Sequence, residues 1–131
     1  MITGGCLCGA VRYEIDADAF EDDASYCHCT MCRRWSGSAF SLSVRAPSAQ
    51  LRWTEKMPKR YRSSHLAWRA FCDECGSPIY FQYEGKPEYY ALAVGSLDKP
   101  NDLKPADHWG VESRIAWIKI DDGLPQNVTP E

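Results

Sequence analysis

The seven cysteines of this chain, and the short gaps between them, constrain its fold more than any other feature. An odd number of clustered cysteines argues against a complete disulfide framework and fits a reducing compartment. Sulfurs one or two residues apart can converge on one metal ion, at about 2.3 Å from each sulfur. The spacing therefore predicts zinc binding by three groups, Cys6-x-Cys8, Cys27-x-Cys29-x-x-Cys32 and Cys72-x-x-Cys75.

The pair Cys72 and Cys75, followed by Gly76, has the spacing of a zinc knuckle, in which two sulfurs lie on one side of a tight turn. Such a pair needs two more ligands. Cys6 and Cys8 are candidates, because alternate residues of an extended segment point the same way. A structural zinc site of these four cysteines would tie the start of the chain to its middle.

That pairing leaves Cys27, Cys29 and Cys32, which is the number of protein ligands typical of a catalytic zinc with an exchangeable fourth position. In an extended Cys27-His28-Cys29 segment the His28 side chain points away from the sulfurs, so we expect it not to bind the metal. The alternative is a second structural ion whose fourth ligand comes from elsewhere, such as His65 or His108.

Three thiolates around one Zn²⁺ leave a net negative charge, which makes the ion a weaker Lewis acid than one held by neutral histidines. A thiol therefore suits the fourth position better than water. Arg33 and Arg34 follow Cys32 directly and could hold the carboxylates of such a thiol. Backbone and hydroxyl groups of Ser36, Gly37 and Ser38 could assist. The predicted substrate-binding residues are Arg33, Arg34, Trp35, Ser36, Gly37, Ser38 and Phe40, of which Trp35 and Phe40 would line the site.

Short segments rich in aromatic and β-branched residues, separated by Gly, Pro or charged turns, predict a mainly β fold. Residues 10–15 alternate, which places Val11, Tyr13 and Ile15 on one face. A turn or two of helix is expected from Thr30 to Trp35, with Thr30 as cap and Gly37 as terminator. The expected strands are residues 10–15, 38–44, 50–54, 59–63, 67–72, 79–83, 89–94 and 114–120.

The chain has 131 residues, which is the length of one ordinary domain, and we expect a single domain over residues 1–131. No apolar stretch approaches the length of a membrane span, and the amino terminus lacks the pattern of a secretory signal, so we expect a cytoplasmic protein. Basic and aromatic residues alternate from Lys59 to Arg62, with Arg69 beyond them. A half-exposed strand explains this better than nucleic-acid binding, because the net charge is −3.

Four segments of the sequence together resemble successive motifs of the glutathione-dependent formaldehyde-activating (GFA, or CENP-V/GFA) domain family. The resemblance continues in residues 108–114, Trp117 and residues 122–125, and all seven cysteines fall on the family's positions. The four segments are Gly5–Glu14, Cys27–Phe40, Phe71–Tyr80 and Gly95–Asp98.

The resemblance implies a β-tent type fold of several small antiparallel sheets with two Zn²⁺ ions per chain. It implies a structural zinc at Cys6, Cys8, Cys72 and Cys75 and a catalytic zinc at Cys27, Cys29 and Cys32. The implied reaction is that of a carbon-sulfur lyase, which joins glutathione or a similar thiol to an aldehyde such as formaldehyde, or the reverse. The alternative is a zinc-stabilised, non-catalytic protein-interaction module. Neither a nucleic acid nor a membrane is an expected partner, and a homo-oligomer is left open.

Overall fold

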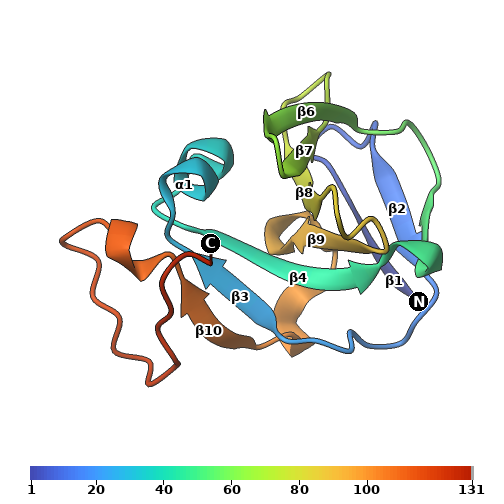
Figure 1. Ribbon diagram of the computed structural model, residues 1–131. Coiled ribbons are helices and arrows are strands. Elements are labelled where there is room, and N and C mark those ends of the chain that lie inside the picture. Colours follow the sequence, from blue (N-terminus) through green and yellow to red (C-terminus); the bar gives the residue numbers. More distant parts are fainter. Residues whose placement is uncertain (131) are drawn as a thin grey trace.

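Two β-sheets form the body of the molecule, and one short helix stands at an end of the larger sheet (Figure 1). This computed structural model describes residues 1–130. The ten strands are β1 (Ile2–Gly5), β2 (Arg12–Ile15), β3 (Ala24–Cys27), β4 (Ser41–Pro47), β5 (Leu51–Trp53), β6 (Lys59–Ser64), β7 (Ala67–Phe71), β8 (Pro78–Tyr83), β9 (Tyr89–Ala93) and β10 (Pro105–Trp109). The helix is α1 (Thr30–Ser36), and the 3-10 turns are η1 (Ser48–Gln50), η2 (Val94–Ser96), η3 (Pro100–Asp102) and η4 (Val111–Ser113).

The smaller sheet has the order β1-β2-β5, and the larger has the order β10-β3-β4-β9-β8-β7-β6. All neighbouring strands are antiparallel except β10 and β3, which run parallel. The predicted mainly β fold of more than one sheet is confirmed. The parallel pair was not predicted, and it brings residues 105–109 beside residues 24–27.

The core lies between the two sheets, where β2 faces the middle of the larger sheet. The apolar face predicted for residues 10–15 is confirmed, because Val11, just before β2, and Tyr13 and Ile15 within it are each at most 1% exposed. They belong to one cluster with Val44 of β4 and Leu92 of β9, which are equally buried. Burial of such side chains contributes about 1.5–3 kcal/mol each, so this contact fixes the sheets against each other.

Most of the predicted strands are present with shifted ends, but the strand predicted at residues 114–120 is wrong. That segment lacks regular structure, because the Ile118 N–H donates to the Ile115 carbonyl at 2.9 Å and closes a turn. Trp117 in this turn is 73% exposed. Its apolar residues gave a strand-like pattern although no neighbouring strand pairs with it. The sequence analysis also missed β1, β3 and β10.

The N-cap residue of helix α1 differs from the prediction. The N-cap is Cys29, whose sulfur accepts a hydrogen bond from the Cys32 N–H at 3.3 Å, so Thr30 is the first helical residue. The predicted end at Gly37 is confirmed. Gly37 has φ 71° and its N–H donates to the Arg33 carbonyl at 3.0 Å, a left-handed cap that glycine adopts without strain.

Candidate metal centres

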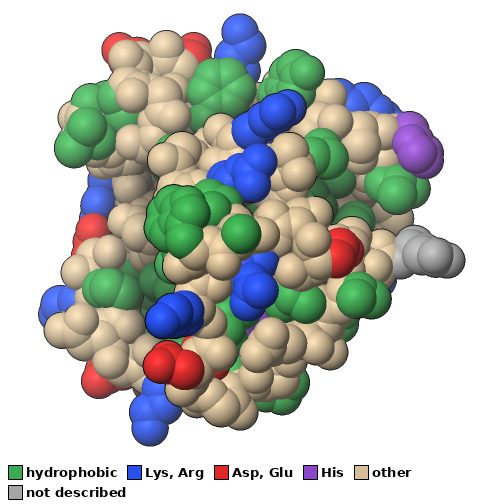
Figure 2. Space-filling view, turned by 90° about the vertical axis from the view of Figure 1, so that its left-hand side faces the viewer, with side chains coloured by type: hydrophobic (Ala, Val, Ile, Leu, Met, Phe, Trp, Pro, Cys, Tyr) green, Lys and Arg blue, Asp and Glu red, His purple; other side chains and the backbone are tan. Residues whose placement is uncertain are grey.

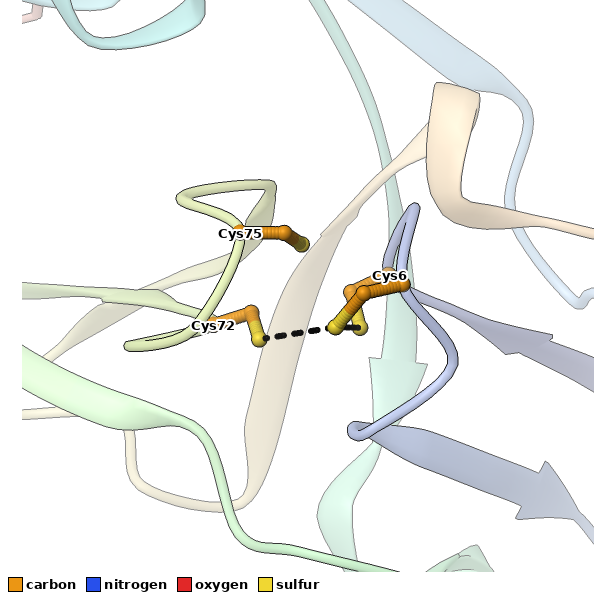
Figure 3. Close-up of side chains that lie close together, drawn as sticks. Cys6, Cys72 and Cys75 are labelled. Atoms are coloured by element: carbon orange, nitrogen blue, oxygen red, sulfur yellow. Dashed lines mark hydrogen bonds between the residues drawn. The ribbon is translucent and has the colours of Figure 1, made fainter.

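Four cysteine sulfurs converge where the smaller sheet meets the larger one. Cys6 and Cys8 lie in the turn after β1, and Cys72 and Cys75 lie in the turn between β7 and β8. All four sulfurs are within 4.8 Å of one another. Figure 3 shows Cys6 facing Cys72 and Cys75 across the gap between the two turns. This four-cysteine cluster joins parts of the chain that are 64 residues apart.

The two turns have glycines where their backbone needs them. Gly9 has φ 84° and Gly76 has φ 80°, and both are in the left-handed region that side chains other than glycine rarely adopt. The Gly76 N–H donates to the Cys72 carbonyl at 2.8 Å and closes the knuckle. Residues 6–9 also form a turn, with Gly9 N–H near the Cys6 carbonyl at 3.3 Å. The predicted extended Cys6-x-Cys8 segment is therefore wrong, although its sulfurs do converge.

Nearby N–H and O–H groups point at the sulfurs of this cluster. The Val11 N–H donates to Cys6 Sγ at 3.2 Å and the Glu74 N–H donates to Cys72 Sγ at 3.4 Å. Hydrogen bonds from the side chain and backbone of Ser77 lower the pKa of Cys75 to about 5. These donors favour thiolates, which are the form that binds metals.

The donor set of the four-cysteine cluster fits a zinc ion. A tetrahedral ion with sulfur ligands at about 2.3 Å needs sulfurs about 3.8 Å apart. Cys6 Sγ lies 3.6 Å from Cys8 Sγ, and Cys8 Sγ lies 3.8 Å from Cys72 Sγ. Four soft thiolates are the usual ligands of a structural zinc.

A second cluster consists of Cys27, Cys29 and Cys32, whose sulfurs also lie within 4.8 Å of one another. Cys27 ends β3, Cys29 caps α1 and Cys32 is in its first turn, so six consecutive residues supply all three sulfurs. In residues 1–130 no His, Asp or Glu joins this group at the same distance. The three-cysteine cluster thus has the ligand number of a zinc site with one exchangeable position.

His28 lies between two of these cysteines but points elsewhere, as predicted. It is 1% exposed, and its Nε2 is 2.9 Å from Nδ1 of His108. His108 Nε2 in turn is 2.8 Å from Asp122 Oδ2. Burial first, and then the charge of His108, lowers the pKa of His28 and keeps the ring neutral. His28 and His108 are therefore partners of each other, and His65 is an exposed loop residue outside the cluster.

Strand β10 forms a wall behind the three-cysteine cluster, which the sequence analysis missed. The His28 N–H donates to the Trp109 carbonyl at 2.8 Å, which fixes the segment between Cys27 and Cys29. Gly110 has φ 64°, and a Cβ on it would lie 2.9 Å from the Cys29 backbone nitrogen. Only glycine fits this close approach. The sequence signal for this close approach was Gly110 itself, which directly follows the two ring-bearing residues His108 and Trp109.

Arg69 of β7 reaches the cluster from the other side. Its Nη1 and Nη2 atoms lie 3.7 and 3.6 Å from Cys32 Sγ. The side chain is 5% exposed, so the prediction of a half-exposed strand residue is wrong for Arg69, whereas Arg60 and Arg62 of β6 are exposed. Hydrogen bonds from Cys27 and Cys29, followed by the charge of Arg69, lower the pKa of Cys32, whereas hydrogen bonds with Cys29 and Cys32 raise the pKa of Cys27.

The predicted substrate-binding residues lie in α1 and in the loop after it, and they differ in exposure. Arg34, Gly37 and Ser38 are exposed, and Arg33 is half-buried. Figure 2 shows a row of Lys and Arg side chains down the face of the molecule on which α1 lies in Figure 1. This face therefore offers positive charge to an anionic ligand.

The remaining predicted binding residues have neighbours within the protein. Ser36 Oγ lies 3.3 Å from the Arg33 carbonyl and accepts the Ser38 N–H at 3.2 Å. Phe40 packs edge-on against Tyr26, with 5.2 Å between ring centroids. Trp35 is half-buried, and its Nε1–H is enclosed without a hydrogen-bond acceptor in the described structure. Ser36 and Phe40 thus stabilise the loop after α1.

No helix among residues 1–130 has both the length and the apolar character needed to cross a membrane. Helix α1, the one α-helix in that range, has seven residues.

The fold and the two cysteine clusters define a mainly β protein with two candidate thiolate metal centres. The family model described as glutathione-dependent formaldehyde-activating enzyme matches residues 1–113, and the chain belongs to this family. A protein of Schizosaccharomyces pombe described as an uncharacterized lyase is 38% identical over 91 residues. That alignment covers 69% of this chain and 64% of the relative, so it spans less than two thirds of the relative's length.

A solved structure supports the fold. The crystal structure of a Rhodobacter sphaeroides protein, a structural-genomics target, is similar with a TM-score of 0.63 and 29% sequence identity. The match covers 79% of this chain and 97% of that protein.

Proposed function

We propose that this protein is a carbon-sulfur lyase that joins a small thiol, such as glutathione, to an aldehyde, such as formaldehyde, or catalyses the reverse reaction. The observation that carries the proposal is the convergence of Cys27, Cys29 and Cys32 without a fourth ligand in the described chain. Membership of the glutathione-dependent formaldehyde-activating family supports the same reaction class. The name of the S. pombe relative, an uncharacterized lyase, agrees with it.

The proposal assigns one Zn²⁺ ion to each cluster. Cys6, Cys8, Cys72 and Cys75 would hold a structural ion, and Cys27, Cys29 and Cys32 would hold a catalytic one. When bound at the three cysteines, zinc would supply a soft Lewis acid that stabilises a thiol in its thiolate form.

The residues around α1 would bind and orient the thiol. Arg33 and Arg34 lie in the last turn of α1, where guanidinium groups can hold carboxylates through paired hydrogen bonds. Ser38 and Gly37, both exposed beyond the helix, offer hydroxyl and N–H groups for the same carboxylates, together with Ser36. Trp35 and Phe40 would form the apolar side of the site.

The reaction balances without an external oxidant or reductant. The sulfur forms a bond to the carbonyl carbon, the C=O π bond opens, and the proton lost by the thiol ends on the carbonyl oxygen. The reverse reaction breaks the C–S bond and returns the proton to sulfur. The task of the protein's residues is therefore to hold the thiol and to present it to a small electrophile.

Metal analysis with and without glutathione tests this proposal. The expected result is two zinc ions per chain. A mild chelator should remove one of them readily, and glutathione should change the rate at which this same ion is removed. Mixing the loaded protein with glutathione and formaldehyde should accelerate adduct formation, measured by exchange NMR. Two equally resistant ions, no effect of thiols and no acceleration would contradict the enzyme and favour the non-catalytic interaction module.

A further inference from the structure

Arg69 is a buried cation without a carboxylate partner. The side chain is 5% exposed, and none of the ion pairs found in residues 1–130 includes it. Its hydrogen bonds go from Nη1 and Nη2 to the sulfur of Cys32. Its Nε–H is enclosed and has no acceptor within residues 1–130. Buried charges in proteins are almost always paired, so the position of Arg69 requires an explanation.

The packing around Arg69 fixes the guanidinium group. Arg69 pairs with Phe81 across β7 and β8, and its guanidinium carbon lies 4.8 Å from the centroid of the Phe81 ring. The ring of Trp35 lies 5.1 Å away and comes from α1. Aromatic faces attract cations, and the planar guanidinium stacks on them. The sheet and the helix therefore hold the charge at a defined place beside Cys32.

The three-cysteine cluster is the source of the missing negative charge. A buried cation is strongly unfavourable unless an anion lies beside it. The group in contact with Arg69 is the sulfur of Cys32, which carries negative charge when the cluster holds a metal ion. The described geometry thus places a buried guanidinium directly against a sulfur of the three-cysteine cluster.

Three thiolates around a divalent ion carry one excess negative charge, and Arg69 cancels it. A centre that is neutral overall takes up a further anion with less electrostatic repulsion than one that already carries a negative charge. We propose that Arg69 is the fixed counterion of the three-cysteine centre and that it sets the class of the exchangeable ligand as an anion, the thiolate of the substrate. This inference rests on the proposed function.

The role proposed for Arg69 differs from that of Arg33 and Arg34. Arg34 is exposed and Arg33 is half-buried, so both can meet carboxylates that arrive from solvent. Arg69 is enclosed by Trp35, Phe81 and Cys32 and acts on the metal–sulfur centre itself. The sulfur of the substrate and its carboxylates are therefore expected to depend on different arginines.

The first test measures the metal. The zinc-loaded protein is titrated with a chromophoric chelator, which should resolve one weakly and one tightly bound ion. Arg69→Met should weaken the first ion about 10–100-fold, the usual effect of removing a group that supports metal ligands. Arg69→Lys should lie between native and Arg69→Met, because it keeps the charge and loses the paired donors. The tight ion should be unchanged in both variants.

The matched control is Arg60→Met. Arg60 lies on the adjacent strand β6 and also stacks on a tryptophan, Trp68, at 4.3 Å, but it is exposed, and the guanidinium hydrogen bonds to a cysteine sulfur found in residues 1–130 come from Arg69. The Arg60→Met variant should leave the affinities for both ions unchanged. An equal effect of Arg60→Met and Arg69→Met would overturn the assignment of Arg69 as a specific counterion.

The second test measures the affinity for the exchangeable ligand. Cobalt replaces zinc, because the sulfur-to-cobalt absorption band reports thiol binding. Arg69→Met should raise the Kd of 2-mercaptoethanol, which has no carboxylate, and of glutathione by the same factor of about ten or more. Arg34→Met should raise the Kd of glutathione alone. An Arg69→Met variant that binds both thiols like the native protein would contradict the proposal.

The native protein provides a test that needs no variant. Thiocyanate and azide should change the cobalt spectrum at concentrations at which the neutral ligand imidazole does not, and a preference for imidazole would refute the proposal even if Arg69→Met does not fold. If the native chain binds no metal at the three cysteines, the proposed function fails. If the native chain binds a metal ion there, and Arg69→Met changes neither the metal affinity nor the Kd of the thiols, only the counterion role fails.

Discussion

The two cysteine clusters differ in how much of the chain they connect. The four-cysteine cluster joins turns that belong to different sheets and lie 64 residues apart. The three-cysteine cluster takes all its sulfurs from residues 27–32. A metal ion that closes a long loop removes far more freedom from the unfolded chain than one that closes a short loop. We therefore expect an ion at the four-cysteine cluster to stabilise the fold, and an ion at the three-cysteine cluster to be exchanged without loss of the fold.

Their surroundings differ in the same sense. Glycines with positive φ shape the turns of the four-cysteine cluster, and N–H groups of its own turns point at its sulfurs. The three-cysteine cluster depends instead on residues brought from elsewhere, namely Gly110 and the carbonyl of Trp109 on one side and Arg69 on the other. The four-cysteine cluster is thus shaped by the turns that carry its cysteines, whereas the three-cysteine cluster has walls supplied by the tertiary fold.

The largest expected effect separates the two clusters directly. Structural zinc can supply about 10–16 kcal/mol of apparent binding free energy, so Cys75→Ser should unfold or precipitate the protein. Cys32→Ser should keep the fold, lose one zinc ion and lose turnover. Thermal unfolding followed by circular dichroism, with zinc analysis of the soluble fraction, measures both outcomes. Two variants of equal stability and metal content would remove the proposed division between the clusters.

The wall behind the three-cysteine cluster can be displaced by a single methyl group. Gly110→Ala adds a Cβ that would lie 2.9 Å from the Cys29 nitrogen, at φ 64°. The left-handed backbone costs about 1–2 kcal/mol and the overpacking about 1–3 kcal/mol more. We expect a loss of about 2–5 kcal/mol in denaturant unfolding and weaker binding of the exchangeable ion.

Gly123→Ala is the matched control for the wall. Gly123 has φ 74°, but a Cβ there would meet nothing within 4 Å. This variant should lose only the backbone contribution of about 1–2 kcal/mol and bind both metal ions normally. Equal losses in the two variants would show that the contact with Cys29 carries no energy.

The histidine pair behind the cluster should have a smaller effect. His108→Asn removes the partner of the buried His28 Nε2, which leaves this ring nitrogen unsatisfied at a cost of about 1–3 kcal/mol. His65→Asn, at an exposed loop residue, is the control and should be neutral. Chemical denaturation and chelator titration should show a loss of stability and a weakened exchangeable ion in His108→Asn alone. A shift in the tight ion would contradict the separation of the two clusters.

The smallest effect concerns a buried hydrogen bond between β2 of the smaller sheet and η2. Tyr13 Oη lies 2.7 Å from Ser96 Oγ, and burial raises the pKa of Tyr13 to about 12. Tyr13→Phe should cost about 1 kcal/mol at pH 7. Because the native pKa is raised, the folded protein loses stability as pH rises from 10 towards 12. Tyr13→Phe should flatten that part of the pH profile in urea unfolding, and an unchanged profile would contradict this origin.

Much of the four-cysteine cluster and the β2 face could be predicted, because both depend on short-range patterns. The Cys-x-x-Cys-Gly knuckle needs only a local turn, and the alternation of Val11, Tyr13 and Ile15 reports a half-buried strand directly. The four-cysteine pairing itself came from the family resemblance together with spacing. Spacing limits which sulfurs can meet but does not choose among turns that are distant in the sequence.

The remaining features depend on tertiary contacts. Arg69 alternates with its neighbours like any residue of a half-exposed strand, and the sequence does not tell that Trp35 and Phe81 cover it. The parallel pairing of β10 with β3 requires the chain to return after some 80 residues, as the separation of His28 and His108 shows. Conversely, residues 114–120 have a strand-like composition but no strand beside them. Local sequence patterns therefore predicted burial correctly only where contact with a single neighbouring strand or turn determines whether a residue is buried.

The parallel pairing of β10 with β3 has a consequence for biosynthesis. A chain emerging from the ribosome presents its cysteines in order, and the last sulfur of the four-cysteine cluster appears with Cys75. The wall behind Cys29 is complete only after residues 108–110 and their partners at residues 125–127 have followed. With synthesis at about 5–20 residues per second, the nascent protein presents all four sulfurs of the four-cysteine cluster seconds before the wall behind the three-cysteine cluster can form.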